Sequence, residues 1–504
     1  MASAPRAAAA AVPAAKPRDT LLPWLLLAAF VVLGLIAVAH HEPWRDEADF
    51  WLAARDMPLL DILRRGGYVG TPALWTLLLA PFARLGLPYE TLGLVNLALA
   101  SGAAGFVLLA APFALPLRAL IAFSFFFSYE YAVVARSYAL GVLLVFAWSW
   151  LDARRPPRPL ARGLVLALLF NCSVHAMALA TPLLWIEAWD WWKGRASASR
   201  ADRVGLAIAA VGGALAVLQI LPPADGQLQG FSAEVSARWA RVSLAGALLP
   251  SLEQRPVAMV AVALLWIATA LELLRRPRAL VVLVGASVLL WAIFALKYSG
   301  TLRHWGHLLV ALIVARWIAA GEESRERAAQ GAAGRAAPVR RRGGARALAA
   351  LTTWGLGAAL AWSVFFAWRN WDRDLRYPFS ESRAMARYLI DQHLERAPIL
   401  AWPAPQGSAV LAHLPKRRFW YPGIRDSGSY MRWDRRYEEG MTLSDADLLY
   451  RAREVFPGRS DALLLTNRPI AGAEETGFVR IHVAAGEAMM YDERYVLYRR
   501  EPMP

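Results

Sequence analysis

The feature that most constrains this chain is a series of long apolar runs separated by short charged loops. The runs recur from residue 21 to residue 367, and the chain as a whole is 57% hydrophobic with a mean hydropathy of +0.35. A helix needs roughly 20 apolar residues to cross the hydrocarbon core of a bilayer. The sequence therefore predicts an α-helical polytopic membrane protein with about eleven transmembrane helices.

The positive charge of the chain fits the same interpretation. A net charge of +16 would suggest a nucleic-acid partner for a soluble protein, but here the arginines lie mostly in short loops between apolar runs. Loops rich in Lys and Arg stay on the cytoplasmic side and orient the helices. We expect no nucleic-acid partner, a cytoplasmic N-terminus and a C-terminus outside. The Arg- and Ala-rich composition favours a bacterial inner (plasma) membrane.

The alternation of charged loops also predicts the domain organisation. Three polar or short segments need special placement: 48–66 as interfacial helices, 73–87 as a membrane-dipping helix, and 162–191 as two short helices broken at Asn171–His175. Residues 222–255 are expected to form an outer loop. The expected units are a cytoplasmic tail (1–20), a transmembrane catalytic domain (21–320) with its first outer loop (40–89), a disordered basic cytoplasmic linker (321–347), a last transmembrane helix (348–367) and an extracytoplasmic domain (368–504).

The last of these units changes character, because charges and turn residues become frequent and no further run could span a membrane. Helical and strand patterns alternate in it, which is typical of a small α/β domain. The sequence does not decide whether this domain binds an acceptor or a partner. The expected helices are 381–390 and 445–456, and the expected strands are 398–402, 461–466, 478–484 and 494–500.

The densest reactive stretch is residues 40–50 (HHEPWRDEADF), directly after the first apolar run. These charges could simply end the helix and mark the membrane interface. Two features favour a site instead: the stretch lies on the predicted outer face, and isolated ionisable or aromatic residues fall on the same face further along. The candidates for catalysis are Asp46 and Glu47, and those for substrate binding are Tyr68, Trp75, Glu130, Arg136, Tyr138, His175, Lys297, Arg303 and His304.

Taken singly, several of these candidates have a structural explanation. Lys297 or Arg303 could be an interfacial anchor, and His175 could be a packing residue. Glu130 and Arg136 could form a structural ion pair. Their coincidence on one face suits a reaction between a hydroxyl and a lipid-borne phosphate, because a carboxylate can take the hydroxyl proton and cations can hold the departing phosphate.

Motifs for other chemistries are absent from the sequence. It contains no HExxH metal motif, no P-loop and no GxGxxG following a strand. The use of ATP or of a nucleotide sugar on the outer side therefore has no support. No metal ligand is assigned from the residues.

The outer-face residues resemble a known family. Trp44–Phe50 (WRDEADF), followed by Gly70–Trp75 (GTPALW), is similar to the first outer loop of the GT-C membrane glycosyltransferases, in particular the protein O-mannosyltransferase and lipid A aminoarabinose transferase group. Arg136–Leu140 (RSYAL) and the short-helix pair broken at His175 are also similar to features of that group. The resemblance covers most of residues 21–370.

The resemblance implies an inverting glycosyltransferase that takes a sugar from a polyprenyl-phosphate donor at the outer membrane face. It implies that Asp46 is the base on the acceptor hydroxyl and that Glu47 is its supporting neighbour. Arg303, with Lys297 or His304, is the candidate for holding the lipid phosphate. The acceptor is a lipid, glycan or protein, and some members of the superfamily use a divalent cation near the acidic loop.

Two departures from the family pattern bear on the substrates. Gly70-Thr71-Pro72 stands where the family often has Lys-Pro-Pro, so one cationic contact is missing. The second acidic site is Glu130 instead of an aspartate. Both departures affect the identity of the sugar and the acceptor more than the class of reaction.

Two other classes of function remain as alternatives. A transporter or flippase of lipid-linked sugars would need polar residues along a path through the membrane, yet the spans are almost entirely apolar, with Asn171 and Gln219 as the polar exceptions. A non-catalytic membrane scaffold would use residues 368–504 as a binding module. Substitution of Asp46 distinguishes these alternatives from an enzyme.

Overall fold

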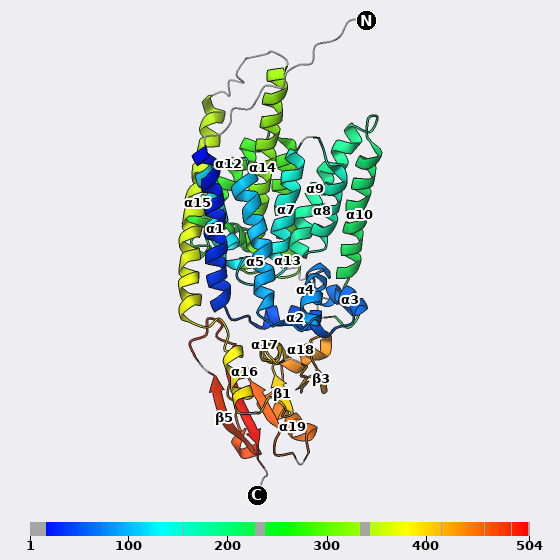
Figure 1. The fold of residues 1–504 in the computed structure, drawn as a ribbon, viewed down its shortest axis with the longest axis vertical. Helices are drawn as coiled ribbons and strands as arrows, with labels where there is room; N and C mark the ends of the chain where they lie inside the picture. Colours follow the sequence, from blue (N-terminus) through cyan, green and yellow to red (C-terminus); the bar gives the residue numbers. More distant parts are fainter. Residues whose placement is uncertain are drawn as a thin grey trace.

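The computed structural model of the chain describes residues 17–154, 156–226, 237–332, 343–414, 416–457, 459–484 and 486–501. Figure 1 shows a bundle of long, roughly parallel helices with a small α/β domain beneath one end. We call this end of the bundle the domain face and the other end the opposite face. Helix α1 (Pro17–His40) begins near the opposite face and ends at the domain face.

The helical part is built from fifteen α-helices and two π-helical turns within the described residues. They are α1 (Pro17–His40), α2 (Arg45–Asp56), α3 (Leu59–Val69), α4 (Leu74–Arg84), α5 (Thr91–Gly105), η1 (Phe106–Ala110), α6 (Leu115–Phe123), η2 (Phe126–Glu130), α7 (Tyr138–Ala153), α8 (Pro159–Phe170), α9 (Val174–Lys193), α10 (Arg200–Ile220), α11 (Ala237–Leu248), α12 (Pro256–Leu273), α13 (Pro277–Leu296), α14 (Leu302–Ala332) and α15 (Gly343–Arg376).

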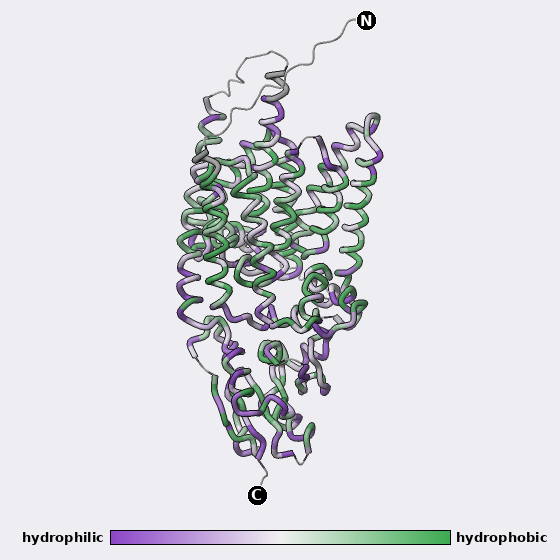
Figure 2. The backbone as a smooth tube through the Cα atoms, viewed as in Figure 1, coloured by the Kyte–Doolittle hydropathy of each residue, from purple (hydrophilic) through white to green (hydrophobic). Residues whose placement is uncertain are grey.

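The bundle has the composition of an integral membrane protein. Seven of the described helical segments are long and apolar enough to cross a membrane. Large apolar side chains such as Trp24, Leu218 and Leu264 are exposed on them, as lipid-facing residues are. Figure 2 shows the hydrophobic residues concentrated along the bundle and hydrophilic residues at its two ends. Shorter apolar helices, among them α7 and α8, account for part of the remaining expected spans.

The expected short helix in 73–87 and the expected break in 162–191 are present, but the helix after the break is 20 residues long and not short. The apolar run 73–87 forms only the 11 residues of α4, and the run 162–191 is split between α8 and α9. The break falls where Ser173 caps α9 by accepting a hydrogen bond from the amide of Ala176 at 3.1 Å. Helices α8 and α10 can approach closely because Gly163 and Gly205 have no side chain. A Cβ atom at either position would collide with the backbone of the other helix.

Two expectations about connecting segments differ from the structure. The predicted outer loop 222–255 contains α11, whose Ala245 and Leu248 are buried against the bundle, because this segment is apolar enough to pack although too short to span. The linker 321–347, expected to be disordered, is helical at both ends: α14 continues to Ala332 and α15 begins at Gly343. Alanine-rich sequence favours such helical extension. Residues 333–342 lie outside the described residues.

The C-terminal part is the expected small α/β domain. It contains α16 (Ser382–Asp391), β1 (Ile399–Trp402), α17 (Ala404–Ala412), β2 (Phe419–Tyr421), β3 (Asp426–Gly428), α18 (Arg435–Met441), α19 (Asp445–Val455), β4 (Leu463–Thr466), the short 3₁₀ turn η3 (Glu474–Thr476), β5 (Phe478–Ala484) and β6 (Tyr495–Arg500).

Its strands form one six-stranded sheet in the order β3-β2-β1-β4-β6-β5. Strand β1 pairs in parallel with β2 and β4, while β6 is antiparallel to both of its neighbours. Strands β1 and β4 are buried along their whole length, as continuous apolar strands at the centre of such a sheet should be. The short elements α17, α18, β2 and β3 were not among the sequence expectations.

The domain is fixed to the bundle through helix α2. One hydrophobic core contains Trp51 and Leu79 of the membrane part together with Val410 and Leu411 of α17. Helix α17 therefore packs directly against α2, as Figure 1 shows. The same reactive stretch that follows α1 is thus held between the bundle and the C-terminal domain.

Candidate active site

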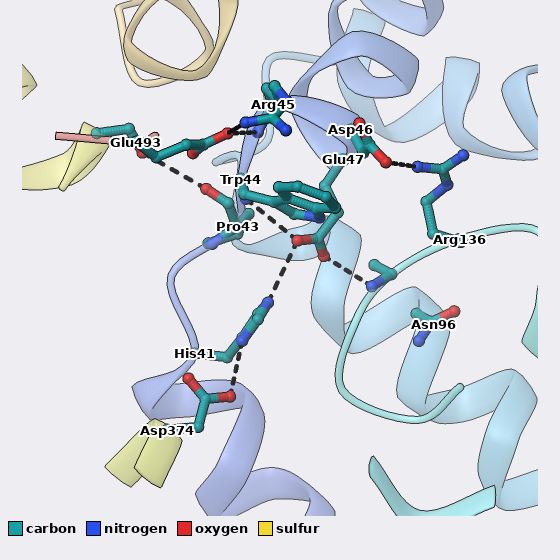
Figure 3. Close-up of polar contacts among 12 residues, drawn as sticks. His41, Pro43, Trp44, Arg45, Asp46, Glu47, Asn96, Arg136, Asp374 and Glu493 are labelled. Carbon is teal, nitrogen blue, oxygen red and sulfur yellow. Dashed lines mark hydrogen bonds and ion pairs between the residues drawn. The ribbon is translucent and has the colours of Figure 1, made fainter. Parts of the chain in front are cut away.

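Glu47 fixes the start of α2. Its side chain reaches back to the amide of Trp44 at 3.2 Å, which satisfies one of the free N–H groups at the helix start. Its other oxygen accepts a hydrogen bond from the amide of Ala135 at 2.7 Å. The carboxylate is fully buried and joins the first loop to the segment that carries Arg136 (Figure 3). Glu47 therefore holds the site together and is not free to react.

His41 completes the support of Glu47. Its Nε2 lies 3.2 Å from Glu47 Oε2, and its Nδ1 lies 2.8 Å from Asp374 Oδ2 near the end of α15. The Tyr129 hydroxyl donates to the same Asp374 oxygen at 3.2 Å. Burial lowers the pKa of His41, but the carboxylates of Asp374 and Glu47 outweigh it and raise the pKa to about 10. A buried imidazolium thus links α1, α2 and α15.

Asp46 points to the other side of the same turn, toward two arginines. Its Oδ2 lies 2.5 Å from Arg136 Nη1 and 3.2 Å from Arg303 Nη1. Burial raises the pKa of Asp46, but Arg136 and Arg303 lower it more, so the net shift is downward. The carboxylate is ionised at neutral pH. Its side chain keeps 34% of its surface exposed, in contrast to the buried Glu47.

Glu130 and two aromatic rings hold the arginines in place. Glu130 Oε1 lies 3.6 Å from Arg303 Nε. Glu130 is the last residue of the π-helical turn η2, and such turns are often found at functional sites. The guanidinium of Arg303 lies 4.8 Å from the centre of the Trp44 ring, and that of Arg136 lies 5.1 Å from Phe50. We call Asp46, Glu130, Arg136 and Arg303 the domain-face cluster.

A group of histidines and tyrosines adjoins this cluster. The His175 ring stacks on His304 with ring centres 4.8 Å apart, and Tyr298 lies 2.6 Å from His175 Nε2 through its hydroxyl. Tyr138 connects the two groups, because its ring contacts His304 and lies 5.9 Å below the Arg136 guanidinium. The structure therefore brings Glu130, Arg136, Tyr138, His175, Arg303 and His304 to one place beside Asp46.

Of the remaining predicted substrate contacts, Tyr68 and Trp75 lie elsewhere, and Lys297 directly precedes Tyr298 of the histidine-tyrosine group. The Tyr68 hydroxyl donates to Asp225 Oδ1 at 3.0 Å, in the segment that follows α10. Trp75 is fully buried in the core shared by α2 and the C-terminal domain, so its position is that of a packing residue and not of a substrate contact. Lys297 is exposed at the end of α13, in the connection to α14.

Other residues of the site were missed from the sequence. Arg45 pairs with Asp492 at 2.8 Å and donates its backbone amide to Glu493 at 2.9 Å, which ties the first loop to the C-terminal domain. Asp374 carries no local signal, because it lies 333 residues from the His41 that it binds. The available hint was His41, because a buried imidazole needs hydrogen-bond partners for both ring nitrogens.

The surroundings of Asp46 and Glu47 do not fit a divalent cation. Their carboxylates face two arginines and an imidazolium, and these positive charges would repel a cation. Among the residues that the structure describes, no group of three or more His, Cys, Asp or Glu side chains is placed to hold a metal ion.

Comparison with known proteins agrees with the fold. No protein-family model matches the sequence, and no curated protein does so. The crystal structure of ArnT from Cupriavidus metallidurans bound to undecaprenyl phosphate matches with a TM-score of 0.51 at 12% sequence identity, over 96% of this chain and 100% of ArnT. The expected likeness in fold to the GT-C membrane glycosyltransferases is thereby confirmed.

Proposed function

We propose that this protein is an inverting glycosyltransferase that moves a sugar from a polyprenyl-phosphate donor to an acceptor hydroxyl. The observation that carries the proposal is Asp46: an ionised, one-third exposed carboxylate that faces two arginines at the end of the helical bundle. ArnT, which has the same fold over its whole length, was crystallised with undecaprenyl phosphate. We further propose that the domain face is the outer face of the membrane.

The two arginines suit the phosphate of such a donor. Guanidinium groups bind phosphate oxygens through paired, charge-assisted hydrogen bonds. Arg303 in particular is fixed from three sides, by Asp46, Glu130 and the Trp44 ring, so it needs little reorganisation when a phosphate arrives. The contact to Asp46 is the one that a phosphate oxygen would replace.

This exchange changes the basicity of Asp46. The arginines hold the pKa of its carboxylate below the ordinary value, which makes it a weak base in the free protein. A donor phosphate that draws Arg303 away removes part of this stabilisation, so the pKa of Asp46 rises when the donor is bound. Donor binding thereby prepares the base.

The proposed reaction then follows in one displacement. Asp46 takes the proton of the acceptor hydroxyl while the hydroxyl oxygen forms a bond to the anomeric carbon. The bond between that carbon and the donor phosphate oxygen breaks from the opposite side, and polyprenyl phosphate leaves with both electrons of the bond, held by Arg303. Attack from the opposite side inverts the anomeric configuration.

Glu47 and the histidine-tyrosine group have supporting parts in this scheme. Glu47 keeps Asp46 and Arg136 in register, because its carboxylate bonds both segments. Tyr138, His175 and His304 lie beside the cluster and offer aromatic faces and hydrogen-bonding groups to the sugar. The acceptor is a lipid, glycan or protein hydroxyl.

The test is release of polyprenyl phosphate from labelled polyprenyl-phosphate sugars by the purified protein, with a crude envelope fraction as acceptor source. The wild type is compared with Asp46→Asn and with the matched control Asp61→Asn, an exposed aspartate of α3 paired only loosely to Arg64 at 3.9 Å. We expect release by the wild type and by the control, and none above background by Asp46→Asn.

The other outcomes are informative in different ways. Equal release by the wild type and Asp46→Asn would remove Asp46 from catalysis. Release of free sugar at the same rate without acceptor would contradict transfer. No release from any donor by well-folded protein would overturn the proposed donor class and favour a transport or scaffold function.

A further inference from the structure

A second polar site lies at the opposite face, far from Asp46. A cavity of about 220 Å³ opens between the start of α8, the end of α9 and the start of α10. The residues that matter for its chemistry are Arg162, Glu187, Asp190, Trp191 and Asp202. Three of these five carry a carboxylate, and one carries a guanidinium.

Several polar atoms in this cavity have no hydrogen-bond partner. Arg162 Nε, Trp191 Nε1 and Glu187 Oε1 are buried and unsatisfied. Glu187 Oε1 lies 3.1 Å from Arg162 Nη1 and forms an ion pair with it, but the angle is not that of a hydrogen bond. Leaving buried donors and acceptors unpaired is costly, so groups of this kind are normally satisfied by water or by a ligand. The cavity is large enough for more than one water molecule.

The arrangement of charge within the cavity is selective. Three carboxylates and one guanidinium line the cavity, and this guanidinium, of Arg162, is already engaged by Asp152 at 3.3 Å and by Glu187. Asp190 is half exposed at the mouth and pairs with Arg278 Nε at 3.1 Å. The interior therefore favours a small cationic group that can donate hydrogen bonds, such as a primary ammonium.

Basic residues flank the cavity-lining residues Gly194 and Asp202 in the sequence, and we take them as the rim of the cavity. Lys193, Arg195, Arg200 and Arg203 are exposed on the turn between α9 and α10 and on the first turns of α10. Lys193 and Arg195 lie over Trp189 and Trp192, exposed aromatic residues of the kind that sit at the headgroup level of a membrane. A basic rim around an acidic interior matches a phosphate that carries an ammonium at its far end.

We propose that this cavity binds the headgroup of an aminophospholipid, with the ammonium between Glu187 and Asp190 and the phosphate at the basic rim. Trp191 Nε1 and Arg162 Nε supply further donors for oxygen atoms of the headgroup. The site is independent of the proposed glycosyl transfer, because it lies at the other end of the bundle and shares no residue with the domain-face cluster. Its ligand is a lipid of the leaflet at the opposite face.

The proposal is tested by native mass spectrometry of the full-length protein in detergent. Phosphatidylethanolamine is compared with phosphatidylcholine of the same acyl chains, because a quaternary ammonium has no N–H to donate. We expect about ten-fold higher occupancy for phosphatidylethanolamine, the difference that one hydrogen-bonded charge pair typically makes. Equal occupancy would overturn the proposal.

Variants separate the cavity from the general surface. Glu187→Gln should reduce phosphatidylethanolamine to the level of phosphatidylcholine, while the control Glu326→Gln, at an exposed residue of α14 outside the cavity, should leave the preference unchanged. Ala198→Trp fills the cavity without changing any charge and should have the same effect as Glu187→Gln. A preference that survives both cavity variants would contradict the assignment.

One further arm identifies the source of the ammonium. Glycerophosphoethanolamine carries the same headgroup without acyl chains, and spermidine carries ammonium groups without phosphate. If the lipid is the ligand, neither compound should displace phosphatidylethanolamine at equal concentration. Displacement by either one would show a site for a soluble cation and would overturn the lipid assignment.

Discussion

The two faces of the bundle each carry an aspartate surrounded by arginines, and the two differ mainly in exposure. At the domain face, Asp46 contacts Arg136 and Arg303 and keeps 34% of its side chain exposed. We call Asp152, Arg162, Arg278 and Arg325 the opposite-face cluster. There Asp152 contacts Arg278 at 2.7 Å, with Arg162 and Arg325 each at 3.3 Å, and only 4% of its side chain is exposed.

Exposure separates a carboxylate that a substrate could reach from one that only ties helices together. Three arginines from three segments use the oxygens of Asp152 and cover it, so it ties helices together and no substrate can reach it. Asp46 has two arginine partners and an open side, which leaves room for an acceptor hydroxyl. Under the proposed function, similar residue types serve stability in one place and chemistry in the other.

The largest expected effect concerns the exposed member of the pair. Asp46→Asn should lower the rate of polyprenyl phosphate release by about 10²- to 10⁴-fold, the usual contribution of a general base, because an amide cannot take the acceptor proton. Initial rates with a fixed donor measure this. The thermal unfolding midpoint should stay close to that of the wild type. Normal activity of Asp46→Asn would show that Asp46 is not the base.

The buried Asp152 should show the reverse, a loss of stability without a loss of activity. Asp152→Asn leaves three arginines without their common carboxylate, and breaking a buried charge network of this kind costs about 3 kcal/mol or more. Thermal unfolding in detergent should show a clear loss of stability. The protein that remains folded should release polyprenyl phosphate at the wild-type rate, and an unchanged unfolding midpoint would show that Asp152 is not a structural tie.

Two arginine-to-lysine changes test whether the arginines of the two faces differ in the same way. Arg303→Lys keeps the charge but loses the planar fork that suits phosphate, so KM for the donor should rise about ten-fold. Arg278→Lys at the other face should leave KM unchanged and affect stability only. The measurement is a donor titration with each variant. Equal KM values for the two variants would show that Arg303 does not bind the donor phosphate.

The smallest expected effect is a dependence of stability on pH that comes from His41. This imidazolium supports the domain face and not the opposite face. Its folded pKa of about 10 lies above the ordinary value of 6.5. The folded state therefore binds the proton more tightly, and this stabilisation is complete below pH 6.5 and is lost as the pH rises through 10.

Chemical denaturation at pH 7 and pH 8.5 checks this dependence. The free energy of unfolding should fall with pH by at most about 1.4 kcal/mol per pH unit. His41→Asn should remove that slope, whereas Asp152→Asn, at the other face, should keep it. A slope that is the same in the wild type and in His41→Asn would show that another group titrates.

Much of the fold could be predicted from the sequence because hydrophobic patterns act locally. The apolar runs identified the helices, and the break at Asn171–His175 identified the pair α8 and α9. Strand β5 coincides with the expected strand 478–484. The extension of α14 beyond residue 320 was missed because disorder was inferred from a Gly, Ala and Arg composition, although alanine is also the best helix former.

The site was predictable in part for a related reason. Asp46 and Glu47 stand in a dense local cluster, and charge at a predicted membrane face is a strong signal, so the sequence also singled out Arg136 and Arg303, which the structure places beside Asp46. The roles of His41 and Asp374 were not, because their meeting depends on tertiary packing between α1 and α15. Trp75 was misjudged because a tryptophan after an outer loop suits a substrate contact and a core position equally well.

The contacts that hold the loop after α1 join residues that are synthesised far apart in time. Asp374 follows its partner His41 by 333 residues, and Glu493 follows its partner Arg45 by 448. Translation at the usual speed separates the first loop from Glu493 by tens of seconds. A nascent chain that has not yet reached Glu493 therefore lacks this contact, and its first loop is held less firmly than in the folded protein.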